Sequence, residues 1–375
     1  MSAPAPIRVL DFGQVMAGPL AGRLMADVGA EVIKIETPEG DSMRGRPPLR
    51  DGHSAYFGTL NAGKRSVVLD LKTEAGRRDA FALAQSADVV IENFRPGVMA
   101  RLGLGYEALS AVNPRLIYCA ISGFGQQGEG AKRPAYAPMI HAASGLDLAL
   151  MDFSPEAERP APTGMFYADV MAAIYAWGAI QTALFERERT GKGQSVDVAL
   201  MDSLISMMIY EVQEAQFPQA RKRHVYVPVK TLDGFVIVVP LSGKNFAAML
   251  SVLGAPDWGN DPRFATPAGR EANWAEIMGH VEAWTASRSA DACEQLFMAA
   301  GVPCSRYRTL SEALADPVSI ERAIVGTVED GAGTFSVPNP PFRMSQTLAQ
   351  VRRMIPALGE GTEEILGALK APHER

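Results

Sequence analysis

The sequence predicts an α/β protein, with an open, parallel, Rossmann-like sheet domain and a smaller α+β domain. Short apolar strands alternate with helices through the first half of the chain, and these strands are apolar along their whole length. Strands of that kind are buried on both faces, as in parallel sheets covered by helices. After about residue 225 the alternation stops and a group of helices follows, which predicts a separate α+β unit.

The first half contains five predicted strands. They cover Ile7–Phe12, Glu31–Glu36, Ser66–Leu71, Asp88–Ile91 and Arg115–Ile121. Helices are predicted at residues 21–28 and 74–85, and two short helical turns lie within residues 97–112. Residues 37–65 are rich in proline, glycine and arginine without periodicity, which indicates a long surface loop of the kind that serves binding.

Residues 163–202 predict two helices joined by a basic turn that contains glycine. The expected inward face of the first helix consists of Val170, Ala173, Ile174, Trp177, Ile180 and Leu184. Asp169 lies at the head of this helix, and the local pattern leaves two roles open. Its carboxylate either caps the helix by accepting from first-turn N–H groups, or is an anionic nucleophile that the helix dipole stabilises.

The predicted small domain spans residues 225–315. Its elements are a strand within residues 230–240 and helices at residues 245–253, 274–285 and 290–300. The predicted large domain spans residues 1–220, and residues 320–375 return to it. A strand near residues 334–337 and a last helix at residues 362–369 belong to the returning segment.

The composition is typical of a soluble protein, with 47% hydrophobic and 21% charged residues. A net charge of −6 leaves no basic surplus to neutralise nucleic-acid phosphates. The three cysteines lie far apart and give no metal-ligand spacing. No segment approaches the roughly 20 apolar residues of a membrane span, and no signal peptide is evident. We therefore expect a cytoplasmic protein without nucleic-acid, metal or membrane partners.

The loops after the predicted strands are the place to look for a site, because ligands of open parallel sheets bind beyond the carboxyl ends of the strands. These loops carry Val15, Met16, Lys72, Asn93, Phe94, Arg95 and Tyr136. Glu36 ends the second strand, where a dehydrogenase places its ribose-binding acid. The first turn, GQVMAGP, does not match G-x-G-x-x-G, which argues against a nicotinamide enzyme.

Seven long segments follow one another from Val9 to Leu369. Among them are VLDFGQVMAGPLAGRLMADVGAEVIKIE, NAGKRSVVLDLKTEAGR, ADVVIENFRPGVMARLGLGYEAL and YADVMAAIYAWGAIQTALFERERTGKGQSVDVALMDS. Together they resemble the family III CoA-transferases, the CaiB/BaiF group of formyl-CoA, carnitine and mesaconyl-CoA transferases. The α-methylacyl-CoA racemases are relatives of this group.

The resemblance implies an enzyme that moves CoA from an acyl-CoA donor to a free carboxylic acid. The reaction would pass through an aspartyl mixed anhydride and an aspartyl-CoA thioester, with CoA as substrate and no metal or redox cofactor. The nucleophile falls on Asp169. The implied CoA-binding residues are Val15, Met16, Lys72, Asn93, Phe94, Arg101 and Tyr136. An interlocked homodimer is also implied, with Phe342 on the segment that returns to the large domain.

Several positions depart from the family pattern. Met16 stands where the formyl-CoA enzymes carry glutamine, which puts a one- or two-carbon substrate in doubt. Tyr136 and Ala137 replace the histidine and aspartate of the racemases, so a second base is missing. We expect His141 to be a hydrogen-bonded helix residue rather than a substitute base. Gly243 is the one glycine of VPLSGKNF, where many members carry a glycine run over the active site.

The basic run Arg221, Lys222, Arg223 and His224 is either a solvated turn or a site for a substrate carboxylate. The second interpretation favours a short-chain or dicarboxylic acid as substrate. Two alternatives to CoA transfer stay open at this point. One is racemisation of a 2-methylacyl-CoA, and the other is non-catalytic binding of CoA.

Overall fold

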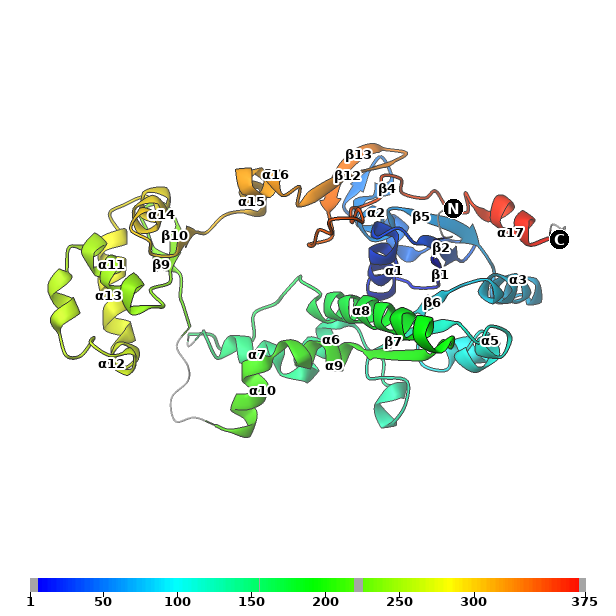
Figure 1. Ribbon diagram of the computed structural model, residues 1–375, viewed down its shortest axis with the longest axis horizontal. Coiled ribbons are helices and arrows are strands. Elements are labelled where there is room, and N and C mark those ends of the chain that lie inside the picture. Colours follow the sequence, from blue (N-terminus) through cyan, green and yellow to red (C-terminus); the bar gives the residue numbers. More distant parts are fainter. Residues whose placement is uncertain (1–5, 155, 219–224, 371–375) are drawn as a thin grey trace. The chain divides into compact units, whose positions relative to one another are not determined.

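A six-stranded parallel sheet forms the centre of the larger part of the chain (Figure 1). The computed structural model describes residues 6–154, 156–218 and 225–370. In spatial order the strands are β5 (Lys64–Val68), β2 (Glu31–Glu36), β1 (Arg8–Asp11), β6 (Val89–Glu92), β7 (Ile117–Ser122) and β8 (Ser195–Ala199). All neighbouring pairs are parallel. The predicted parallel sheet is therefore confirmed, with β8 as a strand that the prediction missed.

Helices cover both faces of the sheet. Val9 packs into the core on one face together with α1 (Ala17–Asp27) and α8 (Tyr167–Thr190). Its neighbour Leu10 packs into the core on the other face, which α3 (Glu74–Gln85) completes. Because successive strand residues point to opposite faces and both faces are buried, the strands read as continuous apolar runs.

Residues 163–202 differ from the prediction in two ways. The helix α8 is followed by strand β8 and then by α9 (Leu200–Met207), so the second half is not a single helix. The buried face of α8 consists of Ala168, Ala172, Ala173, Ala176, Ile180, Ala183 and Arg187. Val170 and Ile174, predicted to face inward, are exposed. Small alanine side chains let α8 lie close to its neighbours, because the distance between packed helices depends on the side chains at the contact.

By length and composition alone, α8 is the one helix in the described parts of the chain that could cross a membrane. The sequence predicted no such segment. A core helix of a soluble protein passes the same test, and the alanines of α8 pack into the core beside α1.

The chain divides into two units, one formed by Met1–Gln216 with Arg322–Arg375 and the other by Phe217–Glu321. The second unit holds a three-stranded antiparallel sheet. Its strands are β9 (Val229–Lys230), β10 (Phe235–Val238) and β11 (Cys304–Arg306). The helices α11 (Gly243–Leu253), α13 (Trp274–Thr285) and α14 (Ala290–Ala299) enclose its core.

The C-terminal segment of the first unit forms the hairpin of β12 (Val325–Asp330) and β13 (Gly333–Pro338) and the final helix α17 (Thr362–Lys370). Arg50 binds both carboxylate oxygens of Asp330 at 2.9 and 2.8 Å. The ring of Phe342 stacks on that of Trp177, with centroids 5.4 Å apart. These contacts attach the C-terminal segment to the N-terminal part of the same unit.

Candidate active site

A cavity of about 630 Å³ lies beyond the carboxyl ends of β1, β6 and β7. The strand order reverses here, because the sheet is built outward from β1 through β2 and β5, and from β6 through β7 and β8. Open parallel sheets bind their ligands at such a crevice. Residues from the three strand-end loops, from the start of α6 (Ala137–Ser144) and from the first turn of α8 line the cavity.

The loop after β1 is held in an unusual conformation. Val15 has a φ of 65°, which is uncommon for a β-branched residue and marks a constrained backbone. Asn93, from the loop after β6, accepts from the Gln14 N–H and donates to the Gln14 carbonyl, both at 2.8 Å. Asn93 therefore clamps the β1 loop across the crevice.

Buried charged side chains bind the backbone at the start of this loop. The ammonium of Lys34 donates to the Gly13 carbonyl at 2.8 Å and pairs with Asp41 at 2.9 Å. Lys64 pairs with Asp11 at 2.6 Å, and Asp11 in turn accepts from the Gly13 N–H at 2.7 Å. Since buried charges are costly without partners, this network disfavours movement of the loop.

The carboxyl group of Asp169 faces the cavity from the first turn of α8. Phe166 is the N-cap, and Asp169 makes no side-chain hydrogen bond or ion pair within residues 6–154, 156–218 and 225–370. The cap interpretation is therefore wrong. Burial raises the pKa of the Asp169 carboxyl to about 6. A partly buried carboxyl that faces open volume without a partner has the access that a nucleophile needs.

His141 lies in the last turn of α6 and is buried. Its Nε2 accepts from the Ala168 N–H at 3.3 Å, so it satisfies one of the free donors at the start of α8. Burial lowers the pKa of His141, which favours the neutral ring that this bond requires. The prediction of a hydrogen-bonded helix histidine is confirmed.

Five of the seven predicted CoA-binding residues line the cavity together with Asp169. They are Val15, Met16, Asn93, Phe94 and Tyr136. Lys72 and Arg101 do not line it and are exposed. Lys72 follows β5, with its N–H donating to Asp70, and Arg101 ends the short helix α4 (Val98–Arg101). A role for these two cations in CoA binding stays a prediction.

Sequence reasoning missed Arg46, Tyr56 and Arg133, which also line the cavity. Arg46 and Tyr56 come from residues 37–65, where the sequence suggested an irregular loop. This segment contains the short helix α2 (Ala55–Asn61), whose N-cap Ser54 accepts from the Phe57 N–H. The sequence signal was the abundance of arginine, but it did not show which arginine faces the site.

Two further predictions concern residues elsewhere in the chain. The basic run at residues 221–224 lies outside the described residues. Gly243 is the first residue of α11 in the second unit, where Ser242 and Asn245 form a capping box. In the described ranges no group of three histidine, cysteine, aspartate or glutamate residues is arranged to hold a metal ion.

The family model of CoA-transferase family III matches residues 5–362. The chain belongs to CoA-transferase family III. This family III chain is 35% identical to the succinate–glutarate CoA-transferase of Agrobacterium fabrum, over 97% of this chain and 95% of the relative. It is also 35% identical to the succinyl-CoA–D-citramalate CoA-transferase of Chloroflexus aurantiacus, over 96% of this chain and 92% of the relative. The resemblance noted from the sequence is confirmed, and so is the class of enzyme.

Two solved structures have the same fold as this family III CoA-transferase. A CaiB/BaiF family protein from Brucella suis matches with a TM-score of 0.83 and 33% identity, covering 99% of this chain and 100% of that chain. Rv3272 from Mycobacterium tuberculosis matches with a TM-score of 0.86 and 32% identity, covering 96% and 98%. The similarity therefore extends over both units of the chain.

Proposed function

We propose that this family III CoA-transferase moves CoA from an acyl-CoA donor to a free short-chain or dicarboxylic acid, with Asp169 as nucleophile. The observation that carries the proposal is the Asp169 carboxyl, which has no partner among the described residues and lies at the wall of a cavity large enough for a substrate. The names of the relatives support this substrate class, because they refer to succinate, glutarate and citramalate.

In the first half-reaction, a carboxylate oxygen of Asp169 attacks the thioester carbon of the donor. A C–O bond forms, the C–S bond breaks, and CoA leaves as a thiolate beside an acyl–aspartyl anhydride. The thiolate then attacks the aspartyl carbonyl and releases the donor acid as a carboxylate. The product is an aspartyl-CoA thioester.

In the second half-reaction, the acceptor carboxylate attacks the aspartyl-CoA thioester and releases the thiolate again. The thiolate attacks the acyl carbon of the new anhydride, which yields the new acyl-CoA and frees the Asp169 carboxylate. The bonds balance with the aspartate, CoA and the two acids alone, so the proposal includes no separate cofactor.

Each addition places negative charge on a carbonyl oxygen, and the start of α1 is suited to stabilise it. Ala17 lines the cavity at the first position of this helix. Within the described residues, the N–H groups of Ala17 and Gly18 donate no hydrogen bond. Free first-turn N–H groups and the helix dipole favour a developing oxyanion.

The path of CoA is proposed to follow the strand-end loops. Val15, Met16, Phe94 and Tyr136 offer backbone and aromatic surface for the pantetheine arm and the adenine ring. Arg95 and Arg133 add two cations to the lining, which suits phosphate groups. Lys72 and Arg101 would extend this basic surface outside the cavity.

The structure supports transfer over the racemase alternative. Racemisation needs two bases that face each other across the α-carbon. His141 is the nearby candidate for the second base, but its Nε2 accepts from the Ala168 N–H and its ring is buried. That bond ties His141 to the backbone of α8.

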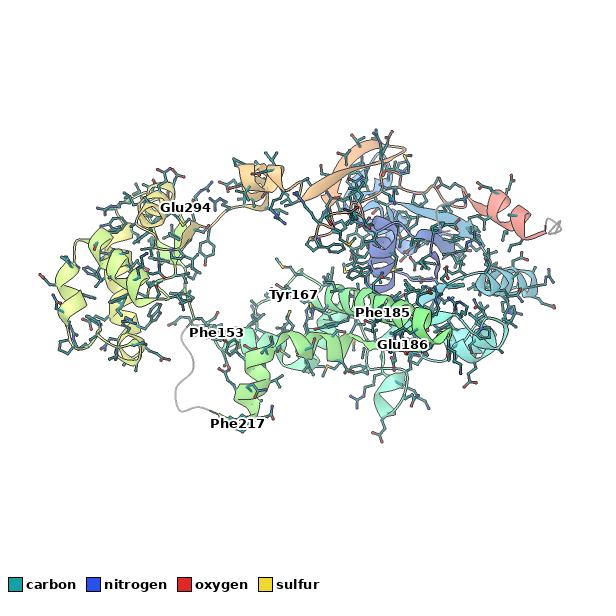
Figure 2. The ribbon with its side chains drawn as sticks, viewed as in Figure 1. Phe153, Tyr167, Phe185, Glu186, Phe217 and Glu294 are labelled. Atoms are coloured by element: carbon teal, nitrogen blue, oxygen red, sulfur yellow. The ribbon has the colours of Figure 1, made fainter. Side chains whose placement is uncertain are left out.

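We also propose a cytoplasmic, interlocked homodimer. Apolar side chains remain exposed along α8, including Val170 and Ile174. Phe185 on the same helix is also exposed and is labelled in Figure 2. An apolar helix face in contact with water favours burial against a partner. A second copy of the chain is the partner that the family resemblance implies.

Replacing Asp169 tests the proposed mechanism. Asp169→Asn should reduce transfer between succinyl-CoA and an added acid by at least about 10⁴-fold, because a neutral amide cannot form the anhydride. Binding of CoA, measured by calorimetry, should be nearly unchanged. Hydroxylamine added during turnover should mark the peptide that contains Asp169 in the wild type alone.

Asp202 provides a matched control, since it is an exposed aspartate in the first turn of α9. Asp202→Asn should transfer CoA at the wild-type rate. Transfer by Asp169→Asn at a rate near that of the wild type would overturn the mechanism. Hydroxylamine modification at a different carboxylate would overturn it as well.

A further inference from the structure

Arg46 and Asp169 line the same cavity, and the guanidinium of Arg46 is available to bind a ligand. Its backbone is fixed, because its N–H donates to the Met43 carbonyl at 3.1 Å and its carbonyl accepts from Ser54 Oγ at 2.6 Å. Its guanidinium makes no hydrogen bond or ion pair with any described residue. The backbone of Arg46 is therefore fixed, and its guanidinium is free to bind a ligand.

The neighbouring arginines are engaged in a different way. Arg44 donates to both carboxylate oxygens of Glu36, at 2.7 and 2.8 Å, and stacks on the ring of Phe57 at 3.9 Å. Arg50 makes the two-pronged pair with Asp330. Both hold the segment to the rest of the unit, whereas Arg46 between them does not.

The charges of Arg46 and Asp169 both act on the hydroxyl of Tyr56. Its side chain lines the same cavity from α2. Burial and the charge of Asp169 raise the pKa of the Tyr56 hydroxyl, and the charge of Arg46 lowers it. Asp41 also acts on Tyr56, but Asp41 is neutralised by Lys34 at 2.9 Å. Of the charged groups that act on Tyr56, Asp169 and Arg46 are thus the two without a partner among the described residues.

Arg46 lies in the part of the cavity that is left for the acyl chain in the proposed reaction. CoA is proposed to follow the loops after β1, β6 and β7, and the acyl group is attached to Asp169 during turnover. The rest of the acyl chain then has the remaining lining, which consists of Met43, Arg46, Pro47, Tyr56, Ala137, Pro138, Phe166 and Leu200. Arg46 is the one cation in this set. A guanidinium pairs strongly with a carboxylate, and a phenol hydroxyl donates a further hydrogen bond.

We infer that Arg46, assisted by Tyr56, binds the second carboxylate of a dicarboxylic acyl group and thereby determines the substrate class. The assignment rests on the proposed function. It deepens that function by separating dicarboxylic substrates from monocarboxylic acids of the same length.

The test compares succinyl-CoA with butyryl-CoA, which has a methyl group in place of the terminal carboxylate. For Arg46→Gln, we expect kcat/KM with succinyl-CoA to fall by about 10- to 100-fold, as for loss of a charge-assisted pair. The value with butyryl-CoA should stay within about twofold of the wild type. Arg46→Lys should recover part of the loss, because it restores the charge without the planar fork.

Arg133→Gln is the matched control, since Arg133 is another cation of the same cavity but lies after β7. It should affect both thioesters equally. An equal effect of Arg46→Gln on both thioesters, or no effect on either, would overturn the assignment.

Binding measurements separate this assignment from the proposed mechanism. In the Asp169→Asn background, adding Arg46→Gln should weaken binding of succinyl-CoA and leave that of butyryl-CoA unchanged. If the wild type transfers CoA from neither thioester, the proposed function fails, and these two affinities alone decide the role of Arg46. Equal affinities with and without Arg46 would then overturn it.

Discussion

The carboxyl group of Asp169 is subject to two opposing influences. Its place in the first turn of α8 favours the ionised form, because the free N–H groups and the helix dipole are positive there. Partial burial favours the neutral form, and the pKa of the carboxyl is raised to about 6. At neutral pH the group is therefore mostly ionised and less hydrated than a surface carboxylate.

This balance predicts an acidic limit to activity. Protonation of Asp169 would remove the proposed nucleophile, so kcat/KM should be constant above about pH 7 and fall as the pH drops through about 6. The loss should approach tenfold per pH unit below that value. Initial rates between pH 5 and 8 measure it, with the melting temperature recorded at each pH as a control for unfolding. A rate that is constant down to pH 5 would contradict the assigned ionisation.

Among the elements, the loop after β1 depends most on contacts from elsewhere in the sheet. Val15 is in the left-handed region and Gln14 is held by the Asn93 amide, 79 residues further along the chain. Both hydrogen bonds of this amide are used on the loop. Asn93 therefore acts on the site chiefly by positioning the cavity wall, in addition to any contact with CoA.

Removing the clamp should affect activity and stability together. Asn93→Ala loses two hydrogen bonds and should lower the free energy of unfolding by about 1–3 kcal/mol. The released loop should also reduce kcat/KM by about tenfold, since the proposed oxyanion donors at the start of α1 follow it directly. Denaturant unfolding and steady-state kinetics measure the two effects.

Asn113 gives the comparison for this variant. Its amide donates to the Ala84 and Ala87 carbonyls at 3.3 and 2.7 Å, and it does not line the cavity. Asn113→Ala should lower stability by a similar amount with nearly unchanged kcat/KM. Equal kinetic losses in the two variants would show that the Asn93 clamp has no specific role at the site.

For the whole molecule, the proposed homodimer predicts that light scattering gives a mass twice that of one chain at micromolar concentration. The exposed apolar face of α8 supplies contacts that salt does not screen, so the mass should stay the same in 1 M NaCl. A mass equal to one chain under both conditions would contradict the proposal.

The open parallel sheet was predictable because its strands are buried on both faces and are therefore apolar along their whole length. The helices α3 and α13 were also predicted with their observed bounds, since their apolar side chains repeat at helical spacing. Strand β8 was missed because it is short, begins with exposed residues and gains its hydrogen bonds from β7. Its strand character depends on a partner about 75 residues away.

Five predicted CoA-binding residues lie with Asp169 at one cavity because they occupy the ends of neighbouring strands, a position that the order of elements implies. The role proposed for Asp169 comes from the resemblance to a known family, because the local pattern left that role open. The inward face of α8 was predicted incorrectly, because hydrophobicity marked the larger side chains and close packing selected the alanines.

From its residues alone, the chain specifies five of the six strands of the parallel sheet, helices such as α3 and α13, and the family to which it belongs, since burial and spacing within an element are local properties. Tertiary structure decided that Asp169 is free of a capping bond, that Asn93 holds the Gln14 backbone, and that Arg46 and Tyr56 face the same cavity. Those features depend on which distant segments pack together, and local periodicity carries no information about that.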